Sequence, residues 1–395
     1  MNAELGRRIA FTLCALLIFR IGTYIPLPGI DIVSARSQSG GIPGTPNMRA
    51  AHSLSIFALS IIPYITAAVL IQLGRMVGSR TLRGLSQAGE HGRRIVYEYT
   101  HYLALLLTVI QAYGISVGLE SFGHWVVEPG LFFRLSTVAT LTGGTIFLIW
   151  LSELITARGV GNGLALILFV GIVTQAPSSF ALVVELGREG VLTGYQILEI
   201  AFFYVAFIGS IVFMELAQRR VPVEYAGRQV GHHSRTSDLA LKLNGAGVFP
   251  IIVVVWFLNV VNGLAGDFNA AWRLGYPGFT IAAAIAIMMF AFRYTSFVLD
   301  PQEAAEKLKA YGGVIPGIAP GAATAAHVDY LVSRTTVLGA SYLALVFLIP
   351  NLMIAYGEAP FYFGGDSALI VVCVVLDISA QVRRDGLLNT GGLRA

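Results

Sequence analysis

The sequence predicts an all-α polytopic membrane protein with ten transmembrane helices, arranged as two inverted five-helix halves. The first observation is the composition: 55% of the 395 residues are hydrophobic and 12% are charged, whereas soluble domains carry roughly twice that charged fraction. The second is a mean hydropathy of +0.72, concentrated in ten apolar segments that each approach the about 20 residues needed to cross a ~30 Å hydrocarbon core. The third is an uneven distribution of basic residues between the two sets of loops.

The predicted spans follow one another along the chain, separated by polar loops. The first follows Arg7 and Arg8 and is not succeeded by a small-residue cleavage site, so we interpret it as a retained span and not as a signal peptide. The ten spans are expected at residues 9–25, 53–72, 99–119, 135–154, 161–184, 194–214, 245–264, 279–298, 335–354 and 367–382.

The second span, SLSIFALSIIPYITAAVLIQ at 53–72, is uncharged but carries Pro63 at its centre. Proline lacks the backbone donor, so within lipid it is tolerated where neighbouring protein or water satisfies the freed groups. We therefore expect this helix to be buried among others, against a cavity. The alternative is a kinked helix that serves only packing.

The even number of spans places both termini on the same side of the membrane. With the amino terminus in the cytoplasm, the large majority of the 26 Lys and Arg residues fall in loops on that side. Short loops rich in Lys and Arg are retained in the cytoplasm. The sequence therefore predicts cytoplasmic termini.

The ten spans divide into an amino-terminal half, 1–190, and a carboxy-terminal half, 191–395. A repeat unit with an odd number of spans inverts across the membrane, and such folds place their site between the halves on interrupted helices. Pro63 in the second span and Pro250 in the seventh occupy corresponding positions. The inverted arrangement is inferred from this count and from the two prolines.

Two predicted cytoplasmic loops, 215–244 and 299–334, are longer than ordinary connections. In the second, Asp300 precedes Pro301, which suits a first helical position, and AEKLKAY predicts a short helix that ends at the Gly/Pro-rich GGVIPGIAPG. We interpret the two loops as a docking platform. The alternative is a pair of ordinary solvated loops.

The sequence carries no recognisable enzyme motif. It has no GxxxxGK[ST] phosphate loop, no HExxH, no CxxC and no GxSxG. Cys14 and Cys373 lie in apolar runs and behave as small hydrophobes, and the adjacent His232 and His233 lie in a polar loop, where they do not make a metal site unaided. We therefore predict no enzymatic activity, no metal and no cofactor.

A secondary transporter is the competing functional class. Ion-coupled carriers use Asp, Glu, Lys or Arg within the membrane, but the second, third, fifth, seventh and ninth predicted spans have none at their centres. The polar residues in or at the ends of the spans suit hydrogen bonding between helices, and they are Gln72, Gln111, Asn162 and Asn244.

Seven runs of sequence are distinctive: IGTYIPLPGID at 21–31, SIFALSIIPYITAAVLIQL at 55–73, GRRIVYEYTHYLALLL at 92–107, ARGVGNGLALILFVGIV at 157–173, LKLNGAGVFP at 241–250, YGGVIPGIAPG at 311–321 and PFYFGGDSALIVV at 360–372. In this order and spacing they resemble the SecY family, the central subunits of the bacterial protein-conducting channel. The resemblance extends over residues 4–384.

This resemblance implies a channel for polypeptides between the two halves, with a waist formed by a ring of apolar side chains. Such a constriction resists ions, yet it can widen around a passing chain because it makes no specific bonds. Matching the motifs places the ring at Ile61, Ile65, Leu164, Leu168, Ile252 and Ile370.

It also implies a lateral gate between the halves, with Gln72, Gln111 and Asn244 at matching positions. The implied function is translocation of unfolded secretory polypeptides across the bacterial cytoplasmic (inner) membrane, with release of membrane segments through this gate. A secondary transporter, or a non-translocating accessory paralogue with a SecY-like fold, is the alternative.

The resemblance implies partners as well: the SecE and SecG subunits, the SecA ATPase and/or the ribosome with the signal recognition particle receptor, the nascent polypeptide and membrane lipid, but not DNA. The two long cytoplasmic loops correspond to the docking site, where arginines suit RNA phosphates or acidic motor surfaces. The docking residues are Arg219, Arg220, Arg228, Pro316, Gly317, Ala319 and Pro320.

Three features depart from the family pattern. Ala319 occupies a position where the family commonly has an arginine, and His232 and His233 stand where relatives often have a basic pair. The glycine-rich plug that seals the resting pore is reduced to about residues 45–53. These departures bear on the docking partner and on the seal, and they indicate a divergent member.

Overall fold

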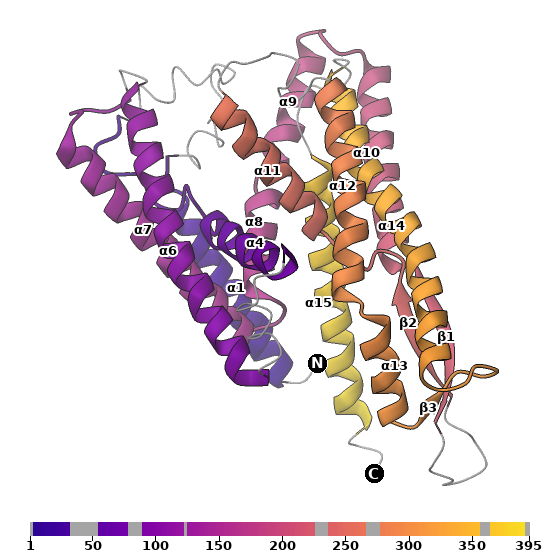
Figure 1. The fold of residues 1–395 in the computed structure, drawn as a ribbon. Coiled ribbons are helices and arrows are strands. Elements are labelled where there is room, and N and C mark those ends of the chain that lie inside the picture. The colour runs from indigo at the N-terminus through magenta and orange to yellow at the C-terminus, as the bar shows by residue number, and fades with distance from the viewer. Residues whose placement is uncertain are drawn as a thin grey trace. The chain divides into compact units, whose positions relative to one another are not determined.

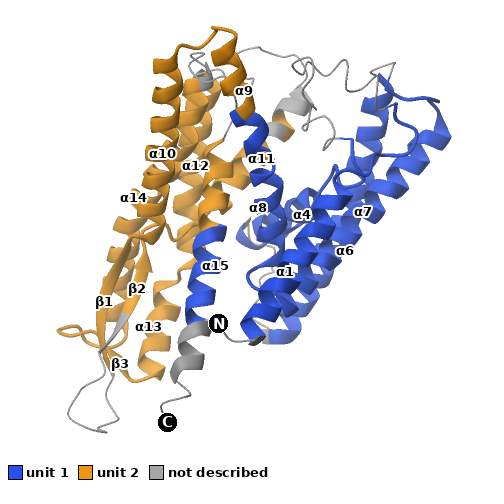
Figure 2. Cartoon of the chain, turned by 180° about the vertical axis from the view of Figure 1, so that it is seen from behind, with its two compact units in different colours: residues 1–180, 374–395 blue, residues 181–373 orange. Residues whose placement is uncertain are grey.

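Figure 1 shows the computed structural model, which is mostly helical and carries a small sheet. The chain divides into two compact units, residues 1–180 with 374–395 and residues 181–373 (Figure 2), and each is described by itself. The predicted plug at 45–53 and the residues Arg228, His232 and His233 lie outside the described part of the chain. The structure describes residues 3–31, 54–77, 89–121, 125–225, 236–265, 277–355 and 364–391.

The first unit is a bundle in which α6 contacts both α4 and α7, while α1 packs on α7 and α8. Its helices are α1 (Ala3–Gly22), α4 (Ile62–Val77), α6 (Gly89–Ser121), α7 (Leu131–Arg158) and α8 (Gly163–Val173). Helix α9 (Ala176–Arg188) begins in this unit, and the later part of α15 (Gly365–Gly391) belongs to it.

The helix of the second predicted span is shorter than expected, because α4 begins at Ile62. Residues 54–61 form turns instead, and Ser60 has a φ of 49°, which lies in the left-handed region. Phe57 stacks against both Phe19 and Phe147, with ring centroids 6.0 and 5.9 Å apart. Pro63 lies in the first turn of α4, where its missing N–H would be unpaired in any case, so it starts this helix instead of kinking it.

The turn between α7 and α8 is held by close backbone packing. Asn162 caps α8, its Oδ1 accepting from the backbone N–H of Leu164 at 3.0 Å. A Cβ on Gly163 would collide with the backbone carbonyl of Ser152, and the Gly163 N–H instead donates to Thr156 Oγ1 at 2.8 Å. The Gly161 N–H donates to Gln381 Oε1 at 2.7 Å, so α15 is joined to the same turn.

The end of α6 and the start of α7 are joined by an ion pair between Glu120 and Arg134. Nε and Nη2 of Arg134 donate to Oε2 of Glu120 at 2.8 and 2.6 Å. Oε1 of the same carboxylate accepts from the Gly130 N–H at 2.9 Å. Both oxygens of Glu120 are therefore occupied, and the pair closes the α6–α7 hairpin.

The second unit is built on α12, which contacts α11 and α14. Helix α10 begins with a capping box in which Thr193 and Gln196 satisfy each other's backbone N–H groups. The helices are α10 (Gly194–Leu216), α11 (Phe249–Ala265), α12 (Pro277–Val298), α13 (Pro301–Ala310) and α14 (Ala322–Ala355), followed by the first turns of α15.

Pro350 lies inside α14 and deprives the carbonyl of Val346 of its usual helical donor. Gly365, the first residue of α15, packs against that same carbonyl so closely that a Cβ would collide with its oxygen. One residue further along, the side chain of Asn351 donates to the Phe347 carbonyl at 2.7 Å. Proline in α14 and glycine in α15 thus let the two helices approach closely.

The two predicted docking loops are joined by a sheet that the sequence analysis missed. Strand β1 (Gln218–Tyr225) pairs antiparallel with β2 (Thr236–Lys242) and with β3 (Gly313–Val314), in the order β2-β1-β3. A buried cluster lies under the sheet and consists of Val221 and Val223 of β1, Ile315 directly after β3, and Val328 and Val332 of α14. The loops therefore form one folded platform with its own core, and not separate solvated loops.

The register of this sheet explains how it accommodates a proline. The Leu243 N–H donates to the Ala217 carbonyl at 3.1 Å, so Ala217 and Leu243 face each other as a hydrogen-bonded pair. Pro222 pairs with Asp238, which the alternation of antiparallel ladders makes a non-hydrogen-bonded pair. The proline nitrogen therefore faces away from β2, so no hydrogen bond between β1 and β2 is lost.

Each of the ten predicted spans contains a helix, so the ten-span all-α prediction is confirmed. The fifth is divided into α8 and α9, with Pro177 in the first turn of α9. In the described part of the chain, seven helices are long and apolar enough to cross a membrane, and α4 and α11 contain shorter apolar stretches. The short helix predicted after Asp300 is α13, with the Asp300 carboxylate accepting from the Gln302 N–H at 2.9 Å.

Candidate functional site

The predicted pore residues of the first unit lie near the starts of α4 and α8. Ile61 precedes α4 and is fully buried, and its carbonyl accepts from the N–H of Ile65 at 3.1 Å. Ile65 is partly exposed, as are Leu164 and Leu168 on α8. The capped start of α8 and the turn before α4 fix where these side chains leave the backbone.

The predicted pore residues of the second unit are Ile252 and Ile370, and both are partly exposed. Ile252 lies in the first turn of α11, where its N–H donates to the Val248 carbonyl at 3.3 Å. Ile370 lies in the second turn of α15. These two residues and the other four belong to different compact units, and the closure of all six side chains into one ring stays a prediction.

The three predicted gate residues have different surroundings. Gln72 on α4 accepts from Nη1 of Arg75 at 3.1 Å, and Gln111 is partly exposed on α6. Asn244 is only 4% exposed. Its Nδ2 donates to Oε1 of Glu215 at 2.7 Å, and its Oδ1 accepts from the Gly247 N–H at 3.0 Å. Within its own unit, Asn244 therefore anchors the segment that leads into α11.

The predicted docking residues that the structure describes lie on the outer surface of the platform. Arg219 and Arg220 are exposed on β1. The loop after β3 exposes Pro316, Gly317, Ala319 and Pro320. The Ala319 carbonyl accepts from Thr324 Oγ1 at 2.9 Å, which ties this loop to the first turn of α14. We call β1 and β2, residues 218–225 and 236–242, the docking ribbon.

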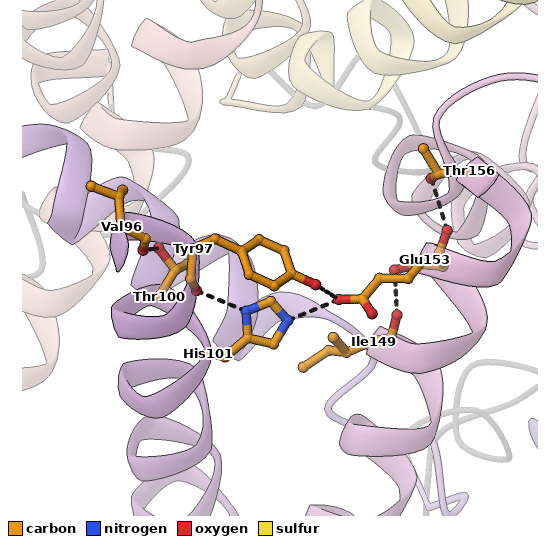
Figure 3. A network of polar contacts seen from close by, with 8 residues as sticks. Val96, Tyr97, Thr100, His101, Ile149, Glu153 and Thr156 are labelled. Carbon is orange, nitrogen blue, oxygen red and sulfur yellow. Dashed lines mark hydrogen bonds and ion pairs between the residues drawn. The ribbon is translucent and has the colours of Figure 1, made fainter. Parts of the chain in front are cut away.

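A polar network joins α6 to α7 in the first unit (Figure 3). Oε1 of Glu153 accepts from the hydroxyl of Tyr97, and it lies 2.9 Å from Nε2 of His101. Nδ1 of His101 lies 2.9 Å from the Tyr97 carbonyl. The sequence analysis missed this network. The i, i+4 spacing of Tyr97 and His101 places them on one helix face, but nothing in the sequence indicates that Glu153, 52 residues beyond His101, is their partner.

The described part of the chain offers no candidate metal site. No group of three or more His, Cys, Asp or Glu side chains there could hold a metal ion. Neither Cys14 nor Cys373 forms a disulfide. The site residues are instead aliphatic side chains, amides and exposed arginines, which suit contact with a polypeptide or a docked partner.

Comparison with known proteins bears on the whole chain. A family model, SecY, matches residues 55–379. Protein translocase subunit SecY of Escherichia coli (strain K12) is 40% identical, over 96% of this chain and 91% of the relative. Protein translocase subunit SecY of Rickettsia typhi (strain ATCC VR-144 / Wilmington) is also 40% identical, over 96% of this chain and 93% of the relative.

Solved structures share the fold at low sequence identity. One, described as the structure of a protein conducting channel, has a TM-score of 0.69 at 16% identity and covers 98% of this chain and 94% of its own. Sec61 in the canine ribosome-channel complex from the endoplasmic reticulum has a TM-score of 0.64 at 15% identity, covering 98% of this chain and 94% of its own. These matches show a common ten-helix architecture.

Proposed function

The chain belongs to the SecY family, and on that premise we propose that it is the channel subunit of a protein translocase. In this role it moves unfolded secretory polypeptides across the membrane and releases membrane segments sideways into lipid. The observation that carries the proposal is the 40% identity to a translocase subunit over 96% of the chain. The role is one of transport, and we propose that the chain itself catalyses no reaction.

The waist of the proposed channel is the ring of Ile61, Ile65, Leu164, Leu168, Ile252 and Ile370. All six side chains are aliphatic, and four of them lie at or near the starts of α4 and α8. An aliphatic constriction sheds water and so resists ions, but it offers no hydrogen bonds that a passing chain must replace. Both the seal and the passage of varied sequences follow from this chemistry.

The proposed lateral gate uses Gln72, Gln111 and Asn244. The amides of Gln72 and Gln111 can hydrogen-bond across helices and release again at modest cost, since such bonds in membranes are worth about 1 kcal/mol each. Asn244 is held within its own unit by Glu215 and Gly247. An apolar segment of about 20 residues gains more by entering lipid than these bonds hold. The gate therefore opens for membrane segments and stays closed against polar chains.

We propose SecE and SecG as the small partner subunits, and SecA and/or the ribosome with the signal recognition particle receptor as docking partners. The exposed Arg219 and Arg220 support a docking surface for phosphates or carboxylates. A fold relative is itself described in a ribosome-channel complex. The chain would lie in the bacterial cytoplasmic membrane with both termini in the cytoplasm, in contact with lipid and nascent polypeptide, and it would not bind DNA.

Site-specific crosslinking tests the proposal. A photoreactive residue replaces Ile65, and a secretory protein is stalled during translation in membranes containing this chain. Phe202, which is 74% exposed on α10, carries the same probe as a control directed at lipid. A crosslink from position 65 but not from 202 supports a polypeptide path past Ile65. No crosslink from 65, with the E. coli relative positive in parallel, contradicts it and favours a transporter or a non-translocating paralogue.

A further inference from the structure

The docking ribbon is attached to the membrane helices at two points. Strand β1 starts at Gln218, directly after α10 ends at Leu216, and β2 ends at Lys242, shortly before α11 begins at Phe249. The ribbon lies beside the early turns of α14 (Figure 1), with which it shares a buried cluster. Two chain connections therefore lead from the ribbon to the membrane helices, residues 215–217 and residues 243–248.

Glu215 bridges these two attachment points. Its Oε1 accepts from Nδ2 of Asn244 at 2.7 Å. The hydroxyl of Tyr342 on α14 lies 3.4 Å from the same oxygen. One carboxylate oxygen thus joins the end of α10, the segment before α11 and the middle of α14.

The surroundings of this carboxylate are closely packed. Asn244 is 4% exposed and Tyr342 is 7% exposed. Gly339 lets α14 approach so closely that a Cβ would lie 3.3 Å from Asn244 Cα. Removing the partner of a buried amide leaves it without a hydrogen bond, which costs more free energy than the bond contributes when it is made. Breaking the bridge is therefore unfavourable.

Asn244 carries the connection onward to α11. Its Oδ1 accepts from the N–H of Gly247, which has a φ of +63°. Gly245 and Gly247 make the intervening backbone pliant, so without a side-chain tie this segment would absorb a displacement of β2. With the tie, the displacement reaches the first turn of α11, where Ile252 lies.

We propose that Glu215 is a positioning residue that couples the docking ribbon to the start of α11, so that a partner bound to the ribbon shifts Ile252. The inference rests on the proposed function, because it assigns to the ribbon a partner that drives translocation. It adds a residue that touches neither the polypeptide path nor the docked partner. The coupling runs through the Glu215–Asn244 bond and is braced by Tyr342.

The test uses the full chain reconstituted in liposomes with its partner subunits and the SecA motor. Three quantities are measured: motor affinity, the rate of preprotein translocation, and the change in amide hydrogen exchange at residues 249–254 when the motor binds. Glu215→Ala should keep its motor affinity but lose about tenfold in rate, and its α11 exchange should no longer respond to the motor. Glu215→Gln keeps an acceptor oxygen and should stay within about threefold of wild type.

Two further variants keep the test decisive if Glu215→Ala folds poorly. Asn244→Ala removes the donor to Glu215 together with the Gly247 contact, so it should reproduce the loss of rate and of the exchange response. Glu199→Ala removes an exposed carboxylate from the same helix and should behave as wild type.

A disulfide supplies a rescue that a merely structural role would not produce. Gln218 pairs with Lys242 across the base of the ribbon, in the non-hydrogen-bonded position where cysteine side chains lie closest. Gln218→Cys with Lys242→Cys is added to Glu215→Ala in a chain whose Cys14 and Cys373 are replaced by alanine. Oxidation should clamp the ribbon base and restore both the rate and the exchange response, and reduction should abolish them again.

The coupling is overturned if Glu215→Ala and Asn244→Ala both translocate and respond as wild type does. It is equally overturned if their motor affinity falls in parallel with the rate, or if the oxidised clamp restores nothing. Should the wild-type chain bind the motor but move no polypeptide, the proposed function fails, and the hydrogen-exchange comparison still decides the coupling.

Discussion

Nε2 of His101 lies 2.9 Å from Oε1 of Glu153, and Nδ1 of the same ring lies 2.9 Å from the backbone carbonyl oxygen of Tyr97. Both neighbours are acceptors. The two contacts are therefore hydrogen bonds together only when each ring nitrogen carries a proton, or when the carboxyl group supplies the proton shared with Nε2. Tyr64 of α4 meets the ring edge-on at 5.2 Å, so one imidazole is a contact point for α4, α6 and α7.

Removing the carboxylate should loosen this contact point. Glu153→Ala removes the carboxylate that contacts both His101 and Tyr97. We expect the free energy of unfolding to fall by about 1 kcal/mol. The loss is small because the side chains of His101 and Glu153 are 28% and 45% exposed. Thermal unfolding in detergent measures the change. Glu98→Ala, which breaks only an exposed pair with Arg94 on the same helix, serves as the control and should cost no more than about 0.5 kcal/mol. Equal effects of the two variants would contradict a role for the network.

The turn before α8 should not tolerate a side chain at its first helical residue. Gly163→Ala places a methyl group against the Ser152 carbonyl, and we expect a destabilisation of about 1–3 kcal/mol because the backbone must shift. Gly171→Ala in the same helix meets nothing within 4 Å and should be neutral or stabilising by up to about 1 kcal/mol. Thermal unfolding of the two variants side by side is the measurement. A stable Gly163→Ala would mean that this turn is not packed as described.

A polar side chain at the proposed waist should make the resting channel leak. Ile65→Asn wets the constriction, so ion conductance across planar bilayers containing the reconstituted channel should rise above that of wild type. Phe202→Asn, on an exposed face of α10, is the matched control and should leave the conductance unchanged. If both variants were as tight as wild type, Ile65 would not contribute to the seal.

The exposed arginines of β1 should govern docking. Replacing both Arg219 and Arg220 by alanine should weaken motor or ribosome binding and flatten its dependence on salt, since fewer charges are neutralised in the complex. Binding to reconstituted membranes at two salt concentrations measures both effects. Arg384→Ala removes an exposed arginine of α15 and should bind as wild type. Unchanged affinity of the double variant would place the docking surface elsewhere.

The membrane helices were predictable because their cause is local. A run of about 20 apolar residues has few alternatives to a helix in lipid, since each backbone polar group must be satisfied within the segment. For the same reason α13 was predictable from Asp300 and Pro301, which cap and start a helix through bonds to their immediate neighbours.

The start of α4 was not predictable, although Pro63 signalled an interruption. An apolar run such as 54–61 suits a helix as well as turns, and it is Phe57, packed between Phe19 and Phe147, that holds it in turns. The docking platform was missed for a related reason. Strand β1 pairs with β3 nearly 90 residues away, and a two-residue strand has no signature of its own.

The sequence by itself determined the membrane class, the ten spans and the capped helix α13, and its resemblance to a family predicted the pore residues. These properties depend on composition, on neighbouring residues and on motifs of fixed spacing. Only the tertiary structure decided that Glu153 contacts His101, that Glu215 accepts a hydrogen bond from Asn244 and that two loops share one sheet. Each of these contacts joins residues that are remote in sequence. The packing of the folded chain selects the partners, so periodicity along the chain does not predict them.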